Sequence, residues 1–378
     1  MIEYILSILI VTGVLFGQLG RLELGDRLVN IYIHEIGMML WLMYQIVKYK
    51  LSSVRGGLLQ NPAVFYFTAW MFIGFAVTSP QFSLTQNIIS FLYPLRFLLY
   101  LLFSTSFIFW VEKSEYNKNI SFHILYTFST MLVGVSLLQY IFVKDLWSMY
   151  PYGWDPHQFR VFATYLDVYV AAAVLGLLTL FWLHQKNFIL VGGLLICLAL
   201  TFSRSAYIAL FMAILVYSFV HKKYKIATIV AAIFIALVFI TPKNWGEGVN
   251  LLRTSTIQSR IADTQLGIRI WKAAPIEGHG YNHLRYVKEQ MNLLHLDDRS
   301  HSASSFHSSY LIILASTGVI GLGLFLWSLY SIFHKKQVMV YGVFLSVMSV
   351  FDNVLLYGMV AIIALFVVVL SRPLRKSQ

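Results

Sequence analysis

Long apolar runs recur along this chain from its first residues to its last, and they limit the folds that it can adopt. A helix needs about 20 residues to cross a hydrocarbon core about 30 Å thick. On that scale the sequence predicts about twelve spanning helices, at residues 2–20, 31–47, 63–79, 88–110, 122–143, 165–183, 188–202, 205–220, 226–240, 308–333, 338–352 and 354–370. We therefore expect an all-α, polytopic fold with residues 1–378 as a single membrane domain.

Composition supports this class and argues against two others. Only 12% of the residues are charged and 58% are hydrophobic, whereas a soluble domain carries about 25% charged residues. The net charge of +12 does not indicate nucleic-acid binding, because the positive residues lie in short connectors between apolar runs. Cys197 is the single cysteine, so neither an intrachain disulfide nor a thiolate metal site is expected.

The positive charges predict the orientation of the helices, because cytoplasmic connectors are rich in Lys and Arg. With the N-terminus inside, the inner connectors hold Lys48, Lys50, Arg55, Lys113, Lys118, Lys186, Lys222, Lys223, Lys225, Lys335, Lys336, Arg372, Arg375 and Lys376. The short outer connectors hold only Arg21, Arg27, Lys144, Arg160 and Arg204. Both termini are therefore predicted to be cytoplasmic, and the first apolar run is interpreted as a retained helix and not a cleaved signal peptide.

One connector, residues 241–307, is far longer than the others and is predicted on the outer face. Its apolar residues have helical spacing, which predicts two amphipathic helices at the membrane surface. The apolar face of the first is predicted from Ile261, Ile268 and Trp271, with Pro275 ending the helix. That of the second is predicted from Leu284, Val287, Met291 and Leu294, with Asn282 as the N-cap.

Polar residues at membrane depth are costly and are therefore the first candidates for function. Arg96 lies inside the fourth predicted span, roughly 12 Å below its outer end at 1.5 Å per residue. It should face a cavity or a partner, unless it snorkels to the surface. Arg204 lies in a Ser-Arg-Ser connector that can fix its guanidinium, although it could also be an ordinary turn charge.

Three further segments carry candidates at the outer face. Arg160 follows the aromatic stretch 150–154, whose rings are typical interface anchors or could stack on sugars. Arg269 and Trp271 lie in the first loop helix, where a solvated charge beside a buried aromatic is the plainer interpretation. His307 is placed to act as a general base or as a polar interface residue. The loop also contains His279, His283, His295 and His301, but no metal-binding motif, and no metal is predicted.

The predicted topology brings several of these residues to one side of the membrane. Arg160, Arg204, Arg269 and His307 come from separate segments yet all fall on the outer face, and Arg96 points toward it. Arginine keeps its charge and binds phosphate in a bidentate way. Several arginines beside a histidine therefore suggest a polyanion held next to a base, and at a membrane this suggests a lipid-linked diphosphate.

Three local motifs resemble the O-antigen ligase and polymerase superfamily of bacterial polytopic glycan transferases. Residues 201–204, Thr-Phe-Ser-Arg, resemble its Ser-Arg element between two spans. Residues 269–271, Arg-Ile-Trp, and 274–281 resemble its Arg-x-Trp and Pro-hydrophobic-x-Gly-x-Gly element. Residues 307–311 and 315–322 resemble its His-Asn-x-x-Leu and Gly-hydrophobic-Ile-Gly element, with Ser308 in place of Asn.

The resemblance implies a C-type glycosyltransferase-like membrane enzyme without cofactor or metal. It would move glycan from undecaprenyl diphosphate to an acceptor hydroxyl, with inversion at the anomeric carbon. His307, Arg269 and Arg204 would be catalytic, and Arg160, Arg96 and Trp271 would bind substrate. Expected partners are the lipid-linked donor, an acceptor glycan or lipid-linked repeat, the bilayer, a chain-length regulator and a flippase.

Two functional alternatives within the resemblance and two outside it stay open from sequence. A polymerase would use another lipid-linked repeat as acceptor, and a ligase would use a lipid A core or another polymer; the prevalence of divergent polymerases in capsule and O-antigen clusters favours the first. A transporter or flippase would show internal repeats and midplane sites, which the sequence lacks. A purely structural membrane subunit would leave the outer-face arginines without a purpose.

Overall fold

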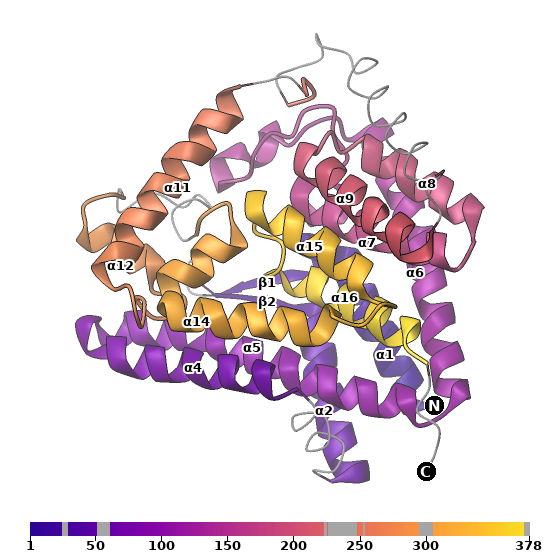
Figure 1. Ribbon diagram of the computed structural model, residues 1–378, viewed down its shortest axis with the longest axis horizontal. Coiled ribbons are helices and arrows are strands. Elements are labelled where there is room, and N and C mark those ends of the chain that lie inside the picture. Colours follow the sequence, from indigo (N-terminus) through magenta and orange to yellow (C-terminus); the bar gives the residue numbers. More distant parts are fainter. Residues whose placement is uncertain are drawn as a thin grey trace.

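The computed structural model describes residues 1–24, 29–50, 61–222, 225, 248–251, 254–294 and 305–373. This part of the chain is mostly helical, and Figure 1 shows the helices packed around one another with a small β-hairpin among them. The expectation of a mostly helical fold is therefore confirmed. The predicted span 226–240 and the loop residues His295 and His301 lie outside the described residues.

The elements follow one another as a series of helices with short connectors. The first half contains α1 (Ile2–Phe16), α2 (Ile33–Tyr49), α4 (Pro62–Thr78), α5 (Leu84–Glu112) and α6 (Glu115–Phe142). The hairpin of β1 (Arg21–Leu24) and β2 (Val29–Tyr32) is antiparallel and pairs Arg21 with Tyr32. The second half contains α7 (Val168–His184), α8 (Phe188–Ala199), α9 (Arg204–His221), α11 (Ser255–Ala273), α12 (Leu284–Gln290), α14 (Ser309–Phe333), α15 (Met339–Phe351) and α16 (Gly358–Ser371). The described residues also form four 3-10 turns: η1 (Gly17–Gly20), η2 (Ser79–Gln81), η3 (Trp147–Tyr152) and η4 (Ala163–Tyr165).

Every predicted span within the described residues coincides with a helix. Six segments among those residues are long and apolar enough to cross a membrane: Ile2–Gly20, α4, α5, α6, α9 and α14. The helices α7, α8, α15 and α16 are apolar but shorter. The closely spaced ranges 188–220 and 338–370 each form two helices, while the number of complete crossings stays a prediction.

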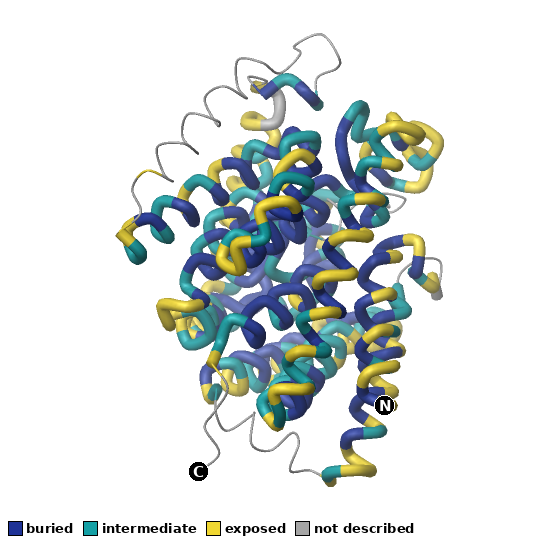
Figure 2. The backbone as a smooth tube through the Cα atoms, turned by 90° about the vertical axis from the view of Figure 1, so that its right-hand side faces the viewer, coloured by how far each residue is buried: buried dark blue, intermediate teal, exposed yellow. Residues whose placement is uncertain are grey.

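The core is built around α7, which is apolar on all sides. Fourteen of its residues are buried, and the small residues of its stretch 170–173, Val-Ala-Ala-Ala, let neighbouring helices approach closely. A Cβ on Gly176 of α7 would lie only 2.2 Å from the ring of Phe344 in α15. Small residues are the usual means of close helix packing in membranes. Figure 2 shows buried residues concentrated in the middle, with buried and exposed residues alternating along helices at the edges.

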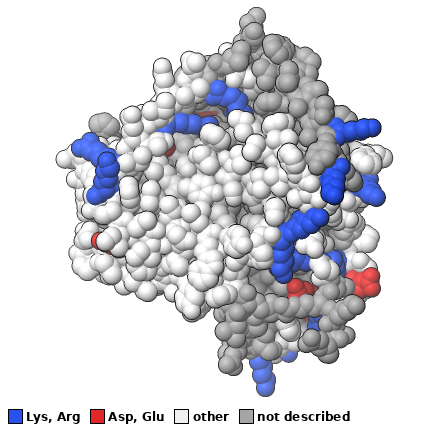
Figure 3. All heavy atoms as spheres, in the orientation of Figure 1, with Lys and Arg blue, Asp and Glu red and all other residues white. Residues whose placement is uncertain are grey.

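Much of one side of the molecule carries few charged side chains. In Figure 3 the centre of the face is almost free of Lys, Arg, Asp and Glu side chains, and the basic groups lie around it. Large apolar side chains such as Ile73, Val77 and Ile141 are more than half exposed. Exposing apolar surface of this kind is unfavourable in free energy in water and costs little in hydrocarbon. The surface therefore suits contact with lipid.

Both predicted loop helices are present, with one correction at the N-cap of the second. Helix α11 ends at Ala273 just before Pro275, as predicted. Its buried face, however, contains Gly267 and Ile270, while Ile261 and Ile268 are 53% and 37% exposed. The isoleucines therefore form an apolar face of their own, on the side of α11 that is turned away from the packed core. The second helix buries Leu284 and Val287 as predicted.

The start of the second loop helix differs by one residue from the prediction. His283, and not Asn282, is the N-cap of α12. Asn282 has a φ of 69°, so it belongs to the turn that precedes the helix. A left-handed backbone is a position that Asn tolerates better than most residues, and this explains the misplaced N-cap.

Helix α14 is interrupted at Gly318, whose φ of 67° and ψ of −171° are not helical. The segment 275–279 fills the interruption. The carbonyl of Pro275 accepts a hydrogen bond of 3.0 Å from the N–H of Val319, and the N–H of His279 donates one of 3.1 Å to Ala315. The backbones approach so closely that a Cβ on Gly318 would lie 1.9 Å from the Ile276 oxygen. A Cβ on Gly278 would likewise lie 2.5 Å from the nitrogen of Gly318, so close packing explains both of these glycines.

Substitution of Gly318 should therefore destabilise the protein more than substitution of another glycine in the same helix. We expect Gly318→Ala to lower stability by about 3 kcal/mol or more, because a strained backbone alone costs about 1–3 kcal/mol and the clash adds to it. Gly323→Ala is the matched control, since nothing lies within 4 Å of its added Cβ. The melting temperature of each purified variant in detergent measures the effect. Equal melting of the two would contradict the packing account.

Candidate functional site

The site is built around His307, which lies just before α14 and is held by Asp263 of α11. The ring Nδ1 of His307 is 2.9 Å from Asp263 Oδ2, and the backbone N–H of His307 donates to the same oxygen at 2.8 Å. With Nδ1 donating, the neutral imidazole has its free lone pair on Nε2. The His307 side chain is 41% exposed while Asp263 is 13% exposed, so Nε2 can meet a reactant.

Asp263 is kept as a carboxylate by this pairing. Burial alone raises the pKa of Asp263, but the ring and backbone hydrogen bonds from His307 outweigh it and leave the pKa below its ordinary value. A carboxylate at Nδ1 fixes the tautomer of a histidine and stabilises its protonated form. Asp263 was not among the residues predicted from sequence, although it is the only acidic residue of α11.

A second ion pair connects α11 to the turn after α15. Arg260 Nη2 lies 2.6 Å from Asp352 Oδ1, and Ser205 donates a hydrogen bond to the other carboxylate oxygen. Asp352 is 1% exposed, whereas the Arg260 side chain is 22% exposed. The guanidinium of Arg260 lies 5.7 Å from the ring centroid of Tyr169. The pair therefore anchors one end of Arg260 and leaves part of it accessible.

Arg204 is the first residue of α9 and belongs to the same cluster of charges. The preceding residue, Ser203, caps α9 by accepting a hydrogen bond from the N–H of Ala206. Arg204 Nη1 donates to the carbonyl of Leu251 at 3.4 Å. Arg160, Arg260 and Asp352 all lie within electrostatic range of its guanidinium. The helix start thus places a cation beside Arg260.

Arg160 supports the backbone turn that precedes Arg204. It is 4% exposed, and its Nε donates to the carbonyl of Thr201 at 2.8 Å. Its Nη2 donates to the carbonyl of Phe202 at 3.4 Å. Phe202 has a left-handed φ of 49°, so the turn is unusual and gains from these contacts. The structure brings Arg160 and Arg204 together, with much of Arg160 bound to the protein itself.

Arg96 lies in a separate polar group formed by α2, α5 and the hairpin. Its Nε is 2.7 Å from Glu35 Oε1, and it also donates to the carbonyl of Asn30. The rings of Tyr93 and Tyr32 lie 5.0 and 5.8 Å from its guanidinium carbon. The prediction that an arginine at this depth has a partner is confirmed. These contacts belong to the N-terminal half and include none of the residues around His307.

Arg269 and Trp271 are not brought to His307 in the structure. Arg269 is exposed and follows Arg260 by nine residues, which is about 180° around a helix. It therefore lies on the opposite side of α11 from Arg260 and about 120° around the helix from Asp263. Trp271 donates from its ring N–H to the carbonyl of Pro275 at 3.1 Å, so it closes the turn after α11.

Two loop histidines serve packing. His279 Nε2 lies 2.8 Å from the carbonyl of Ile270 and ties the turn to α11. The fully buried ring of His283 stacks between those of Phe75 and Phe82, with centroids 5.2 and 4.2 Å away. Burial lowers the pKa of His283 to about 4, so the ring is neutral at pH 7. Within the described part of the chain, no three metal-ligating side chains converge.

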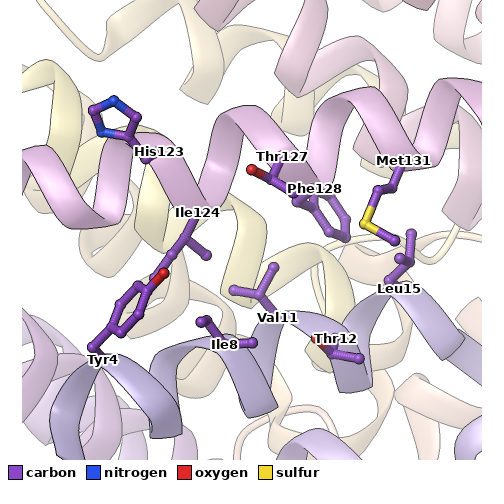
Figure 4. Close-up of a pocket in the computed structure, with 10 residues that line it drawn as sticks. All are labelled: Tyr4, Ile8, Val11, Thr12, Leu15, His123, Ile124, Thr127, Phe128 and Met131. Atoms are coloured by element: carbon purple, nitrogen blue, oxygen red, sulfur yellow. The ribbon is translucent and has the colours of Figure 1, made fainter. Parts of the chain in front are cut away.

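The cleft in Figure 4 lies elsewhere, between α1 and α6. Most of its lining is apolar, and the labelled residues are Tyr4, Ile8, Val11, Thr12, Leu15, His123, Ile124, Thr127, Phe128 and Met131. It contains no Asp, Glu, Lys or Arg, so it offers no cation for a phosphate. Its single histidine, His123, contacts the carbonyl of Asn119 and has no carboxylate partner among the described residues. The cluster around His307 is therefore the candidate site.

Comparison with known proteins gives one match. Residues 188–326 match the family model described as O-antigen ligase. The matched range contains Arg204, Arg260, Asp263, Arg269 and His307, and it ends before Asp352. No curated protein matches the sequence.

The buried histidine of α12 generates a pH prediction. The pKa of His283 is about 4 in the folded protein and about 6.5 when unfolded. As the pH falls, the unfolded state therefore binds a proton at a higher pH than the folded state does. Stability should therefore fall as the pH drops from about 6.5 toward 4. His283→Phe keeps a stacked ring and removes the titration. Its melting temperature should fall less than that of the wild type over this range, and parallel curves would contradict the assignment.

Proposed function

We propose that this chain, whose residues 188–326 match the O-antigen ligase family model, transfers glycan from a polyprenyl-diphosphate donor. The acceptor is a sugar hydroxyl at the outer face of the cytoplasmic membrane. The observation that carries the proposal is the pairing of His307 with Asp263 beside the arginines of α9 and α11. A base next to a diphosphate-binding cluster suits this chemistry.

In the proposed reaction His307 acts as the general base. Its Nε2 accepts the proton of the acceptor hydroxyl while the hydroxyl oxygen attacks the anomeric carbon of the donor sugar. The bond from that carbon to the diphosphate oxygen breaks, and the polyprenyl diphosphate leaves with the bonding electrons. Attack opposite the leaving group inverts the anomeric carbon. Asp263 positions the ring and stabilises the imidazolium that forms.

Arg204 and Arg260 are proposed to stabilise the charge that develops on the leaving diphosphate. Fixed cations at developing charge lower a barrier because they need little reorganisation. Asp352 and Ser205 support Arg260 in one orientation, and Ser203 places Arg204 at the start of α9. Arg160 is proposed to act through the turn that it holds, and Arg96 to position the N-terminal half. Arg269 takes no part in this step, because it faces away from His307.

Contacts between distant segments support the proposed orientation. Each joins two segments that the charge pattern places on the same side of the membrane. On the inner side, Lys48 pairs with Glu3, and Lys118 donates to the carbonyl of Arg372 at 2.6 Å. On the outer side, Arg160 binds the turn at Thr201. The proposal therefore places both termini in the cytoplasm and His307 outside.

Among the acceptors, we favour another lipid-linked repeat, which makes the protein a polymerase of O-antigen or capsule. A ligase that uses a lipid A core or another polymer is the second candidate, and the same site chemistry serves it. A chain-length regulator and a flippase are proposed partners of the polymerase. A flippase activity of this chain itself is disfavoured, since a transporter needs no general base and the His307–Asp263 pair would have no use.

The first test concerns the pair itself. His307→Ala should abolish transfer, and Asp263→Asn should lower kcat by about 100-fold or more with little change in KM, because an amide favours the wrong tautomer. Initial rates of glycan transfer by purified protein with a lipid-linked donor measure both. Thr264→Ala changes an exposed neighbour on α11 and should remain active. Full activity of Asp263→Asn would remove Asp263 from the mechanism.

The second test separates the functional alternatives in the source organism. The gene is deleted and restored as wild type, Arg204→Ala, Arg260→Ala or His307→Ala at matched expression, and surface polysaccharide is resolved on gels. Single repeats without a ladder in the deletion and all three variants would support a polymerase. Complete polymer trapped on the lipid carrier would indicate a ligase. Repeats retained on the cytoplasmic side, or complementation by every variant, would overturn the proposal in favour of transport.

A further inference from the structure

The outward side of α11 has an apolar stripe. Ile257, Ile261 and Ile268 are 48%, 53% and 37% exposed, and at 100° per residue they lie within about 40° of one another around the helix. The opposite side carries the buried Ile270 and the Asp263 that holds His307. The isoleucines thus form a second apolar face, which packs against none of the described core.

Two cations border this stripe. Lys272 lies close to the line of the isoleucines and Arg269 lies beside it. Both side chains are exposed, and neither has an acidic partner among the described residues. The single acid of α11, Asp263, faces the other way. An isoleucine stripe edged only by positive charge is the pattern of a helix that lies on an anionic membrane surface.

The packing of α11 puts this face at the boundary of the bilayer. A Cβ on Gly267 would lie 2.5 Å from Leu311, two residues into the candidate span α14. The segment after α11 contacts α14 at Ala315 and Val319, which are about 9 and 15 Å along the helix from Ser309. Figure 1 shows α11 at the edge of the molecule, next to α12 and α14. Its outward face is therefore level with the outer end of a spanning helix.

We propose that the outward face of α11 is a bilayer-docking surface: its isoleucines enter the acyl-chain boundary, and Arg269 and Lys272 bind the phosphates of anionic phospholipids. This gives Arg269 a role on the side of α11 where it lies. It also makes the bilayer a support for the catalytic pair, because Asp263 is on the inner face of the same helix. The proposal does not depend on glycan transfer.

Spin-label accessibility tests the apolar part. Cys197 is the only cysteine, so a Cys197→Ala background allows single labels at Ile261→Cys and Ile268→Cys. Ser259→Cys is the matched control, exposed and about 160° from Ile261 around the helix. In nanodiscs the isoleucine sites should collide with oxygen more than with a water-soluble nickel complex, and Ser259 should show the reverse. Preference for nickel at the isoleucine sites, or protection from both reagents, would overturn the proposal.

A second arm tests the cations. Arg269→Gln with Lys272→Gln should shift the label at position 268 toward nickel in discs that contain phosphatidylglycerol, and should change nothing in discs of phosphatidylcholine. A shift that is equal in both lipids, or that occurs only when the lipid-linked donor is present, would overturn the assignment to phospholipid phosphates. Both arms are measured without substrate, so their failure is distinct from a failure of the proposed reaction.

Discussion

The interruption of α14 at Gly318 is the constraint on which the site depends. Backbone groups at membrane depth cannot turn to water, so an interrupted helix must find partners within the protein. The partners here are the carbonyl of Pro275 and the N–H of His279. The insertion fixes the end of α11 and the start of α12 against α14. Since α11 carries Asp263 and α14 begins two residues after His307, the same constraint holds the two members of the pair at hydrogen-bond distance.

The charges of the site are arranged so that only part of the positive charge is neutralised within the protein. Asp352 is buried against Arg260, and Asp263 is engaged by His307. Arg160 donates to backbone carbonyls and Arg204 to one more. Carbonyl oxygens orient a guanidinium without cancelling its charge, so the arginines keep a net attraction for an anion. A diphosphate that enters would meet cations already held in place, which is the condition for electrostatic catalysis.

The sequence predicted the helices well and the partners of the site poorly, for identifiable physical reasons. Apolar length marks a spanning helix, and every predicted span within the described residues contains one. Arg204 and His307 were candidates from sequence because a polar or charged residue next to an apolar span stands out. Asp263, Arg260 and Asp352 were missed because their importance comes from pairing across 44 and 92 residues of sequence. No local sequence pattern indicates a contact between residues so far apart in the chain.

What covers the apolar face of α11 is a separate question. Helical spacing of Ile261 and Ile268 correctly predicted an apolar side, but periodicity does not say whether protein or lipid covers it. In a soluble protein the apolar side of a helix nearly always packs against protein. At the edge of a membrane both faces of a helix can be apolar, and the face against protein is then marked by small and polar residues that allow close contact. Gly267 and Asp263 are of that kind, and they identify the side of α11 that faces the site.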